Sequence, residues 1–147
     1  MSVDIRQGVD GSLEMVGDQD STRNPTAGVG WLNASIIYNA PADSSFFVAD
    51  RAYVVKGIRG VVDVAGSDGG AVTFQIRKVA SGTALTSGTV LHSGTFNAKG
   101  TAATNQTLTL STTASDLVIP AGTRLALDVT GTTTAATGCI TVTLAPA

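Results

Sequence analysis

Residues 53–64 read YVVKGIRGVVDV, and this long β-branched run predicts a β-strand. Gly57 and Gly60 lie inside it, and a glycine within a strand often marks a bulge or a bend. Apolar side chains occur on both faces of the run, with Val55 and Val61 on one face and Ile58, Val62 and Val64 on the other. A strand that is apolar on both sides has a covered outer face, so this run also predicts an oligomer or a larger assembly.

Period-2 alternation or short apolar runs continue on both sides of this strand. They occur at residues 32–38, 45–49, 72–76, 89–96, 107–111, 117–119, 124–129 and 139–144. Gly, Ser, Thr and Asp separate them, and Ser67-Asp68-Gly69-Gly70 has the composition of a hairpin turn. No segment carries a helical apolar stripe over ten residues. The pattern predicts an all-β fold, an antiparallel, jelly-roll-like β-sandwich of about 8–9 strands.

The first thirty residues differ from the rest of the chain. They hold five of its eleven acidic residues and no aromatic residue, and their apolar residues fit neither the helical nor the strand period, apart from one short strand expected near residues 12–16. A chain of 147 residues fits one domain. We therefore expect an extended N-terminal arm, residues 1–30, followed by a β-sandwich domain, residues 31–147.

Composition excludes several classes of function. The net charge is −2 and the basic residues form no cluster beyond Arg77-Lys78, which argues against a nucleic-acid partner. Cys139 is the only cysteine, so an intramolecular disulfide and a cysteine-based zinc site are both excluded. No apolar run is long enough for a membrane helix, and the first residues lack the pattern of a secretory signal. We expect no membrane partner and no cofactor.

A few residues have the chemistry of reactive or metal-binding groups. His92, the only histidine, is a candidate general base and Cys139 a candidate nucleophile, but a lone histidine or cysteine in a strand is more often structural. Residues 18–22 read DQDST and match the DxDxT string of haloacid-dehalogenase-like phosphatases, which needs a Rossmann-like domain that this pattern does not predict. The acidic residues of the arm lack the spacing of a calcium loop. We expect no catalytic, cofactor-binding or metal residues, and no enzyme.

The aromatic residues indicate where a partner could bind. Phe46 and Phe47 are adjacent, so a regular strand would turn them to opposite faces, leaving one exposed or covered by a neighbour. Aromatic residues outside a core are enriched at interfaces, although an aromatic tucked under the arm would have the same pattern. With the doubly apolar strand, the candidate interface residues are Trp31, Phe46, Phe47, Tyr53, Val55 and Val61.

From about residue 47 to its end, roughly two thirds of the chain resembles the small jelly-roll head-decoration (cement) proteins of tailed bacteriophages. The segments that carry the resemblance are 47–53 (FVADRAY), 69–73 (GGAVT), 77–79 (RKV), 88–91 (GTVL), 96–97 (FN), 99–104 (KGTAAT) and 120–128 (PAGTRLALD). They are turn and strand patterns and contain no catalytic signature.

The resemblance implies a structural protein on the outer surface of the virion capsid. Such a protein binds the major capsid protein, stabilises contacts between its subunits, and associates with itself as a dimer or trimer. It also implies assembly in the host cytoplasm. We expect the N-terminal arm to order on a neighbouring subunit. The alternative is a carbohydrate- or receptor-binding β-sandwich module of a phage particle, in which Trp31 with Asn33, or Tyr53 with Asp50 and Arg51, would form the site.

Overall fold

The structure, a computed structural model, describes residues 4–7, 13–16 and 30–147. Two short strands, β1 (Asp4–Gln7) and β2 (Leu13–Val16), pair antiparallel with each other. The strand expected near residues 12–16 is thus confirmed by β2, while β1 was not predicted. The rest of the predicted arm, including the DQDST string, lies outside the described residues.

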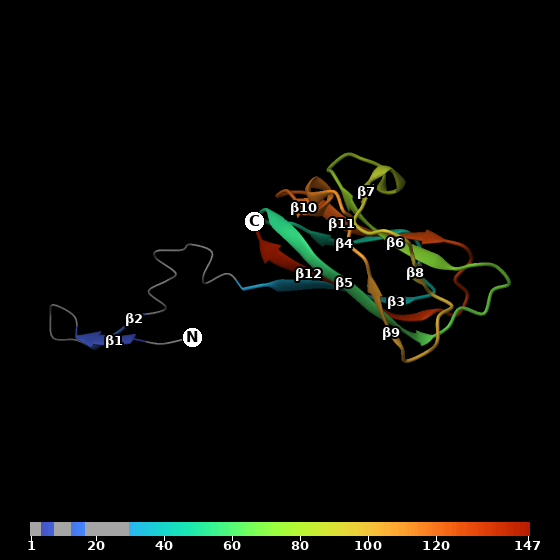
Figure 1. Cartoon of the computed structure of the whole chain (residues 1–147), viewed down its shortest axis with the longest axis horizontal. Coiled ribbons are helices and arrows are strands. Elements are labelled where there is room, and N and C mark those ends of the chain that lie inside the picture. Colours follow the sequence, from blue (N-terminus) through green and yellow to red (C-terminus); the bar gives the residue numbers. More distant parts are fainter. Residues whose placement is uncertain (1–3, 8–12, 17–29) are drawn as a thin grey trace.

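Residues 30–147 form two antiparallel sheets of five strands each (Figure 1). The first sheet has the order β10–β5–β12–β3, with β9 also paired to β5, and the second has the order β4–β11–β6–β7, with β8 also paired to β6. The first sheet contains β3 (Leu32–Asn39), β5 (Tyr53–Val64), β9 (Asn105–Leu108), β10 (Val118–Ile119) and β12 (Thr137–Pro146). The second contains β4 (Ser44–Val48), β6 (Thr73–Val79), β7 (Thr89–Val90), β8 (Phe96–Asn97) and β11 (Arg124–Thr130). Two short 3-10 turns, η1 (Leu85–Ser87) and η2 (Ala114–Leu117), complete the described elements. The all-β antiparallel sandwich is confirmed.

One predicted strand is broken. Residues 89–96 alternate like a strand, yet they form β7 and β8 with a gap between them. His92 leaves the second sheet to form an isolated bridge with Leu110, and Gly94 then takes a left-handed conformation, with φ of +67°, that turns the chain back. Burial does not alternate here, because Leu91 and His92 are adjacent and both buried, and the chain changes its pairing partner at this point.

The turn at residues 67–70 does not close a hairpin. It connects β5 of the first sheet to β6 of the second, so it crosses between the layers. Side chains hold it in place of a strand ladder. The Asp68 carboxylate accepts hydrogen bonds from Thr134 N and Thr134 Oγ1, each at 2.7 Å, and Lys99 Nζ donates to the carbonyl of Gly70 at 3.1 Å.

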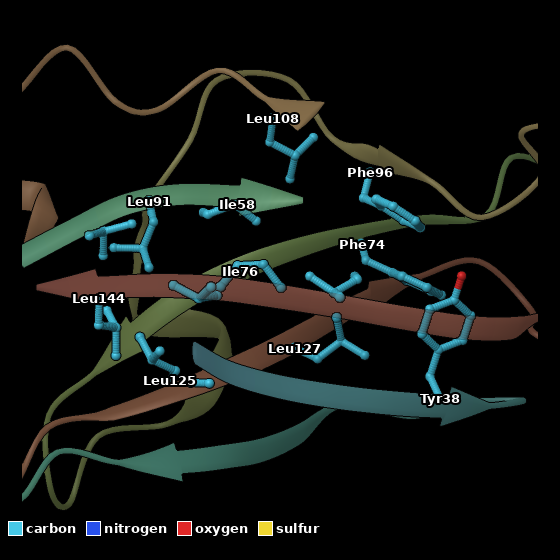
Figure 2. Packing of buried hydrophobic residues seen from close by; sticks show 14 of the residues in the cluster. Tyr38, Ile58, Phe74, Ile76, Leu91, Phe96, Leu108, Leu125, Leu127 and Leu144 are labelled. Carbon is cyan, nitrogen blue, oxygen red and sulfur yellow. The ribbon is translucent and has the colours of Figure 1, made fainter. Parts of the chain in front are cut away.

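The core lies between the two sheets (Figure 2). At one end three aromatic rings pack together. Phe74 and Phe96 stack with centroids 5.8 Å apart, and Tyr38 meets Phe74 edge-on at 5.1 Å. Gly60 makes room for this cluster, because a Cβ at that position would lie 2.7 Å from the ring of Phe96. Gly60 is therefore explained by packing, whereas the bulge predicted for the strand occurs at Lys56 beside Gly57, and the register shifts again at Asp63.

A bulge in β4 changes the interpretation of the adjacent residues Phe46 and Phe47. Phe47 lies opposite Leu125 and Ser45 lies opposite Ala126, so Phe46 is the extra residue in β4. Both rings are partly buried and pack against the core cluster. The expectation that they face opposite sides of a regular strand was wrong, because the bulge bends the strand at this position.

Candidate interaction face

The outer face of the β10–β5–β12–β3 sheet, called the open face below, is the most distinctive surface of the described residues. Three cross-strand rows define it. They are Ile37–Cys139–Val61–Asn105, Ser35–Thr141–Arg59–Thr107 and Asn33–Thr143–Gly57. Arg59 is the only charged residue in the three rows. The open face is therefore neutral over most of its width, and hydroxyl and amide groups alternate on it with aliphatic groups.

The polar groups of the open face partly satisfy one another. Ser35 Oγ and Thr141 Oγ1 are 2.8 Å apart, and Thr143 Oγ1 donates to Asn33 Oδ1 at 3.0 Å. Pairs of this kind between neighbouring strands stabilise a sheet modestly. They also leave few strongly hydrated groups on the surface, so a partner that covered this face would have little charge to desolvate.

Apolar side chains lie beside these polar pairs. Ile37 on β3 is 87% exposed, and Trp31, which comes directly before β3, is 68% exposed. Single exposed apolar residues are common, but an isoleucine this exposed at the edge of a neutral sheet indicates a contact surface. Sequence reasoning missed Ile37, although the signal was present. Ile37 falls on the polar side of the alternation in residues 32–39, where an isoleucine must face solvent or a partner.

The open face is hollowed at one place. A shallow depression of about 170 Å³ lies over β5, β9 and β12. It is lined by Arg59, Gly60, Val61, Asn105, Cys139 and Thr141. Its side chains supply a guanidinium, an amide, a hydroxyl and the free thiol of Cys139. These groups donate and accept hydrogen bonds but contribute no general base.

The structure separates the six candidate interface residues. Trp31 is exposed, and Val61 lies partly exposed on the open face. Tyr53 and Val55 are 4% and 2% exposed and belong to the core cluster, so the expectation that they form an interface is corrected. The bulge at Lys56 is the reason, because it places Val55 on the inner face with Ile58 and not on the outer face with Val61.

The remaining two candidates, Phe46 and Phe47, pack partly buried against the core. Phe47 meets Tyr53 with ring centroids 6.0 Å apart. The Tyr53 hydroxyl donates to Asp50 Oδ1 at 2.5 Å, and this hydrogen bond lowers the pKa of the Asp50 carboxyl. The aromatic groups around Tyr53 therefore build the β4–β5 corner and are not displayed at the surface.

His92 is buried and bound to the backbone. Its Nε2 accepts a hydrogen bond from the backbone N–H of Ile76 at 2.9 Å, which places the ring proton on Nδ1. Burial lowers the pKa of His92. The Nε2 lone pair that a general base would use is thus occupied by the second sheet, where the imidazole replaces a missing backbone acceptor.

Among residues 4–7, 13–16 and 30–147, no three His, Cys, Asp or Glu side chains gather closely enough to hold a metal ion. In the same part of the chain, no helix is long and apolar enough to cross a membrane.

The chain matches no protein-family model, and neither the curated proteins nor the solved structures contain a match.

Proposed function

We propose that this chain is a structural virion protein that binds the outer surface of a capsid shell and stabilises contacts between major capsid subunits. The open face is the observation that carries the proposal. It combines a wide, nearly uncharged sheet surface with two strongly exposed apolar side chains, Trp31 and Ile37. Arg59, in the middle row, is the one charged residue of the three rows, and sparse charge together with aromatic and aliphatic anchors is typical of protein–protein interfaces.

The chemistry of the surface fits a protein partner. Hydroxyl and amide groups on neighbouring strands can donate to and accept from the backbone of a shell protein, and Arg59 supplies one charged group for orientation. The segments at residues 47–53 and 120–128, which resemble decoration proteins, form the β4–β5 corner and β11, so they belong to the scaffold behind this face. The proposal places the protein on the virion surface after assembly in the host cytoplasm.

A charge placed in the centre of the open face tests this proposal. Thr141 lies in the middle row, so the Thr141→Arg variant would bury an unpaired charge under any bound partner. We expect at least about tenfold weaker binding, which corresponds to about 1.4 kcal/mol. Purified variants are mixed with capsid shells of the phage that encodes the chain, prepared without the protein, and bound protein is measured by co-sedimentation.

The matched control is Ser45→Arg, an exposed position on β4 of the other sheet. It adds the same charge to a strand outside the open face and should bind like the unaltered protein. Equal binding of both variants would remove the open face from the proposal. Absence of the chain from purified virions, measured by quantitative mass spectrometry, would refute the virion assignment itself.

The predicted arm is tested separately. Among the residues whose burial the structure describes, the core cluster lies between Ala34 and Leu144, and we expect a variant lacking residues 1–30 to fold. We expect that it retains the far-ultraviolet circular dichroism of a β-protein but shows reduced shell occupancy, because an ordered arm adds contact area. Unchanged occupancy would exclude a role for the arm in binding.

The depression on the open face favours one alternative, a carbohydrate- or receptor-binding module. Arg59, Asn105 and Thr141 line it, and such groups hydrogen-bond to sugar hydroxyls. Trp31 is the one strongly exposed aromatic residue among the described residues. A glycan array probed with the purified protein decides between the two functions. Binding that disappears in an Asn105→Ala variant supports the alternative, and an array without binders leaves the shell proposal.

A further inference from the structure

β3 is an unusual edge strand. Among the described residues its only ladder partner is β12, so one side of its backbone faces no strand. It is eight residues long and contains no charged residue, no proline and no bulge. Natural proteins usually protect sheet edges with charged residues, proline or a bulge, or by keeping the edge strand short. An unprotected edge of this length is a template for pairing with another strand.

The other sheet edges show the contrast. β7, β8 and β10 have two residues each, and β9 has four. β4 has five residues and is interrupted by the Phe46 bulge. Short or bulged strands offer few consecutive backbone groups to a partner, so β3 alone combines length with regularity.

We propose that β3 pairs antiparallel with β3 of a second copy of this chain, joining the two first sheets into one continuous sheet. The absence of charge on the strand removes the like-charge repulsion that would oppose such a contact. A two-fold axis makes the contact isologous, so the dimer closes and does not grow into a filament. The proposal does not depend on the capsid assignment, since it concerns the oligomeric state of the protein alone.

The inner and outer faces of the two sheets restrict the register. A residue on the outer face must lie opposite another outer-face residue, so the axis must pass through a residue and not between two residues. An axis through Ala34 places Trp31 opposite Ile37 of the second copy, and Leu32 opposite Ile36. It thereby sets side by side, on the joined outer face, the two most exposed of the large apolar side chains on this strand and its flank, which are 68% and 87% exposed.

The neighbouring registers do not achieve this. An axis through Ser35 places Trp31 opposite Asn39 and Ile37 opposite Asn33. An axis through Ile36 places Ile37 opposite Ser35. In both cases the exposed isoleucine faces a polar side chain, so cross-strand pairing favours the register centred on Ala34.

Engineered cysteines measure both the contact and its register. In a Cys139→Ser background, Asn33→Cys and Ser35→Cys variants are prepared separately, oxidised alone and as a mixture, and separated on a non-reducing gel. Directly opposed residues of an antiparallel pair have Cα atoms roughly 4.5–5.5 Å apart, within the range of a disulfide. The Ala34 register places residue 33 opposite residue 35, so the mixture should form a cross-linked dimer and each variant alone should form little.

Other outcomes overturn the proposal. Strong cross-linking of Ser35→Cys alone would place the axis at Ser35 and refute the register. Sedimentation equilibrium of the full chain, without engineered cysteines, should give twice the 14.8-kDa mass, and a monomer at all concentrations would refute the dimer. An Ile37→Lys variant should be monomeric. A Val64→Lys variant, which changes another exposed apolar side chain of the same sheet, should remain dimeric.

Discussion

The outer faces of the two sheets differ in how far the chain itself covers them. On the second sheet, Arg77 Nε donates to Asp128 Oδ2 at 2.6 Å, and the two side chains are only 17% and 13% exposed. Arg77 also donates from Nη1 to the carbonyl of Gly88 at 2.7 Å. The segment that follows β6 thus folds back over its own sheet. The open face of the first sheet has no comparable charge network among the described residues, and its isoleucine projects into solvent.

Two further contacts complete the covered face of the second sheet. Arg124 Nη2 donates to the carbonyl of Thr83 at 2.6 Å, and Val79 is fully buried although it lies outside the core cluster. One face is therefore finished within the chain by arginines that hold a loop, whereas the other is left neutral. Partly buried charge thus closes the outer face of the second sheet, whereas the three rows of the open face contain one charged residue, Arg59.

The largest expected effect comes from breaking the ion pair of the covered face. Asp128→Ala leaves Arg77 partly buried without its carboxylate, and removing one partner of such a pair should cost about 2–4 kcal/mol of unfolding free energy. Urea denaturation followed by fluorescence of the single tryptophan measures it. The matched control is Ser35→Ala on the open face, where the partner hydroxyl of Thr141 can turn to water. Equal losses for both variants would contradict the comparison of the two faces.

The β-branched run and the period-2 alternation were sufficient to predict the two central strands of the first sheet. β5 was expected at residues 53–64 and β12 near 139–144, and both carry a regular alternation of side chains over most of their length. Alternation reports burial on two faces, and a strand inside a sandwich has two well-defined faces. For these strands, local sequence and tertiary packing impose the same period.

The faces of the interface candidates were predicted less accurately than the strands, for a physical reason. Val55 and Phe46 were assigned to faces by counting in steps of two, and a bulge lies next to or at each of them. One extra residue reverses every later assignment. Nothing in the local composition fixed the bulge at Lys56 and not at Gly60, because the position depends on how β12 pairs with β5. Ile37 lies in a regular stretch, so its exposure could have been predicted by the same counting.

A smaller effect on stability should come from His92, which lies between β7 and β8 and binds the segment to the second sheet through Ile76 N–H. Its folded pKa is lowered by burial, below an unfolded value of about 6.5. The unfolded chain therefore takes up the proton first as the pH falls. We expect stability that is complete above about pH 6.5 and decreases as the pH drops toward the folded pKa. Urea midpoints measured between pH 8 and pH 5 follow this loss.

The His92→Leu variant separates titration from packing. It leaves the Ile76 N–H without an acceptor, so it should lose about 1–3 kcal/mol at pH 8, where the histidine is neutral. It should also lose the decrease in stability between pH 8 and pH 5, because the carboxyl groups titrate at lower pH. A variant that kept the full pH dependence would show that another group is responsible.

The smallest effect should come from the open face itself. Thr141→Val removes the hydroxyl that lies 2.8 Å from Ser35 Oγ while retaining a β-branched side chain. Because this pair is exposed, water replaces the lost hydrogen bond, and the change in unfolding free energy should stay within about 0.5 kcal/mol. Urea denaturation under the conditions used for Asp128→Ala gives the direct comparison. A loss as large as that of the ion pair would mean that the hydroxyl pairs stabilise the fold, and the neutrality of this face would then need no partner to explain it. A negligible loss leaves the composition of the open face without a role in folding, and binding is then the function that accounts for it.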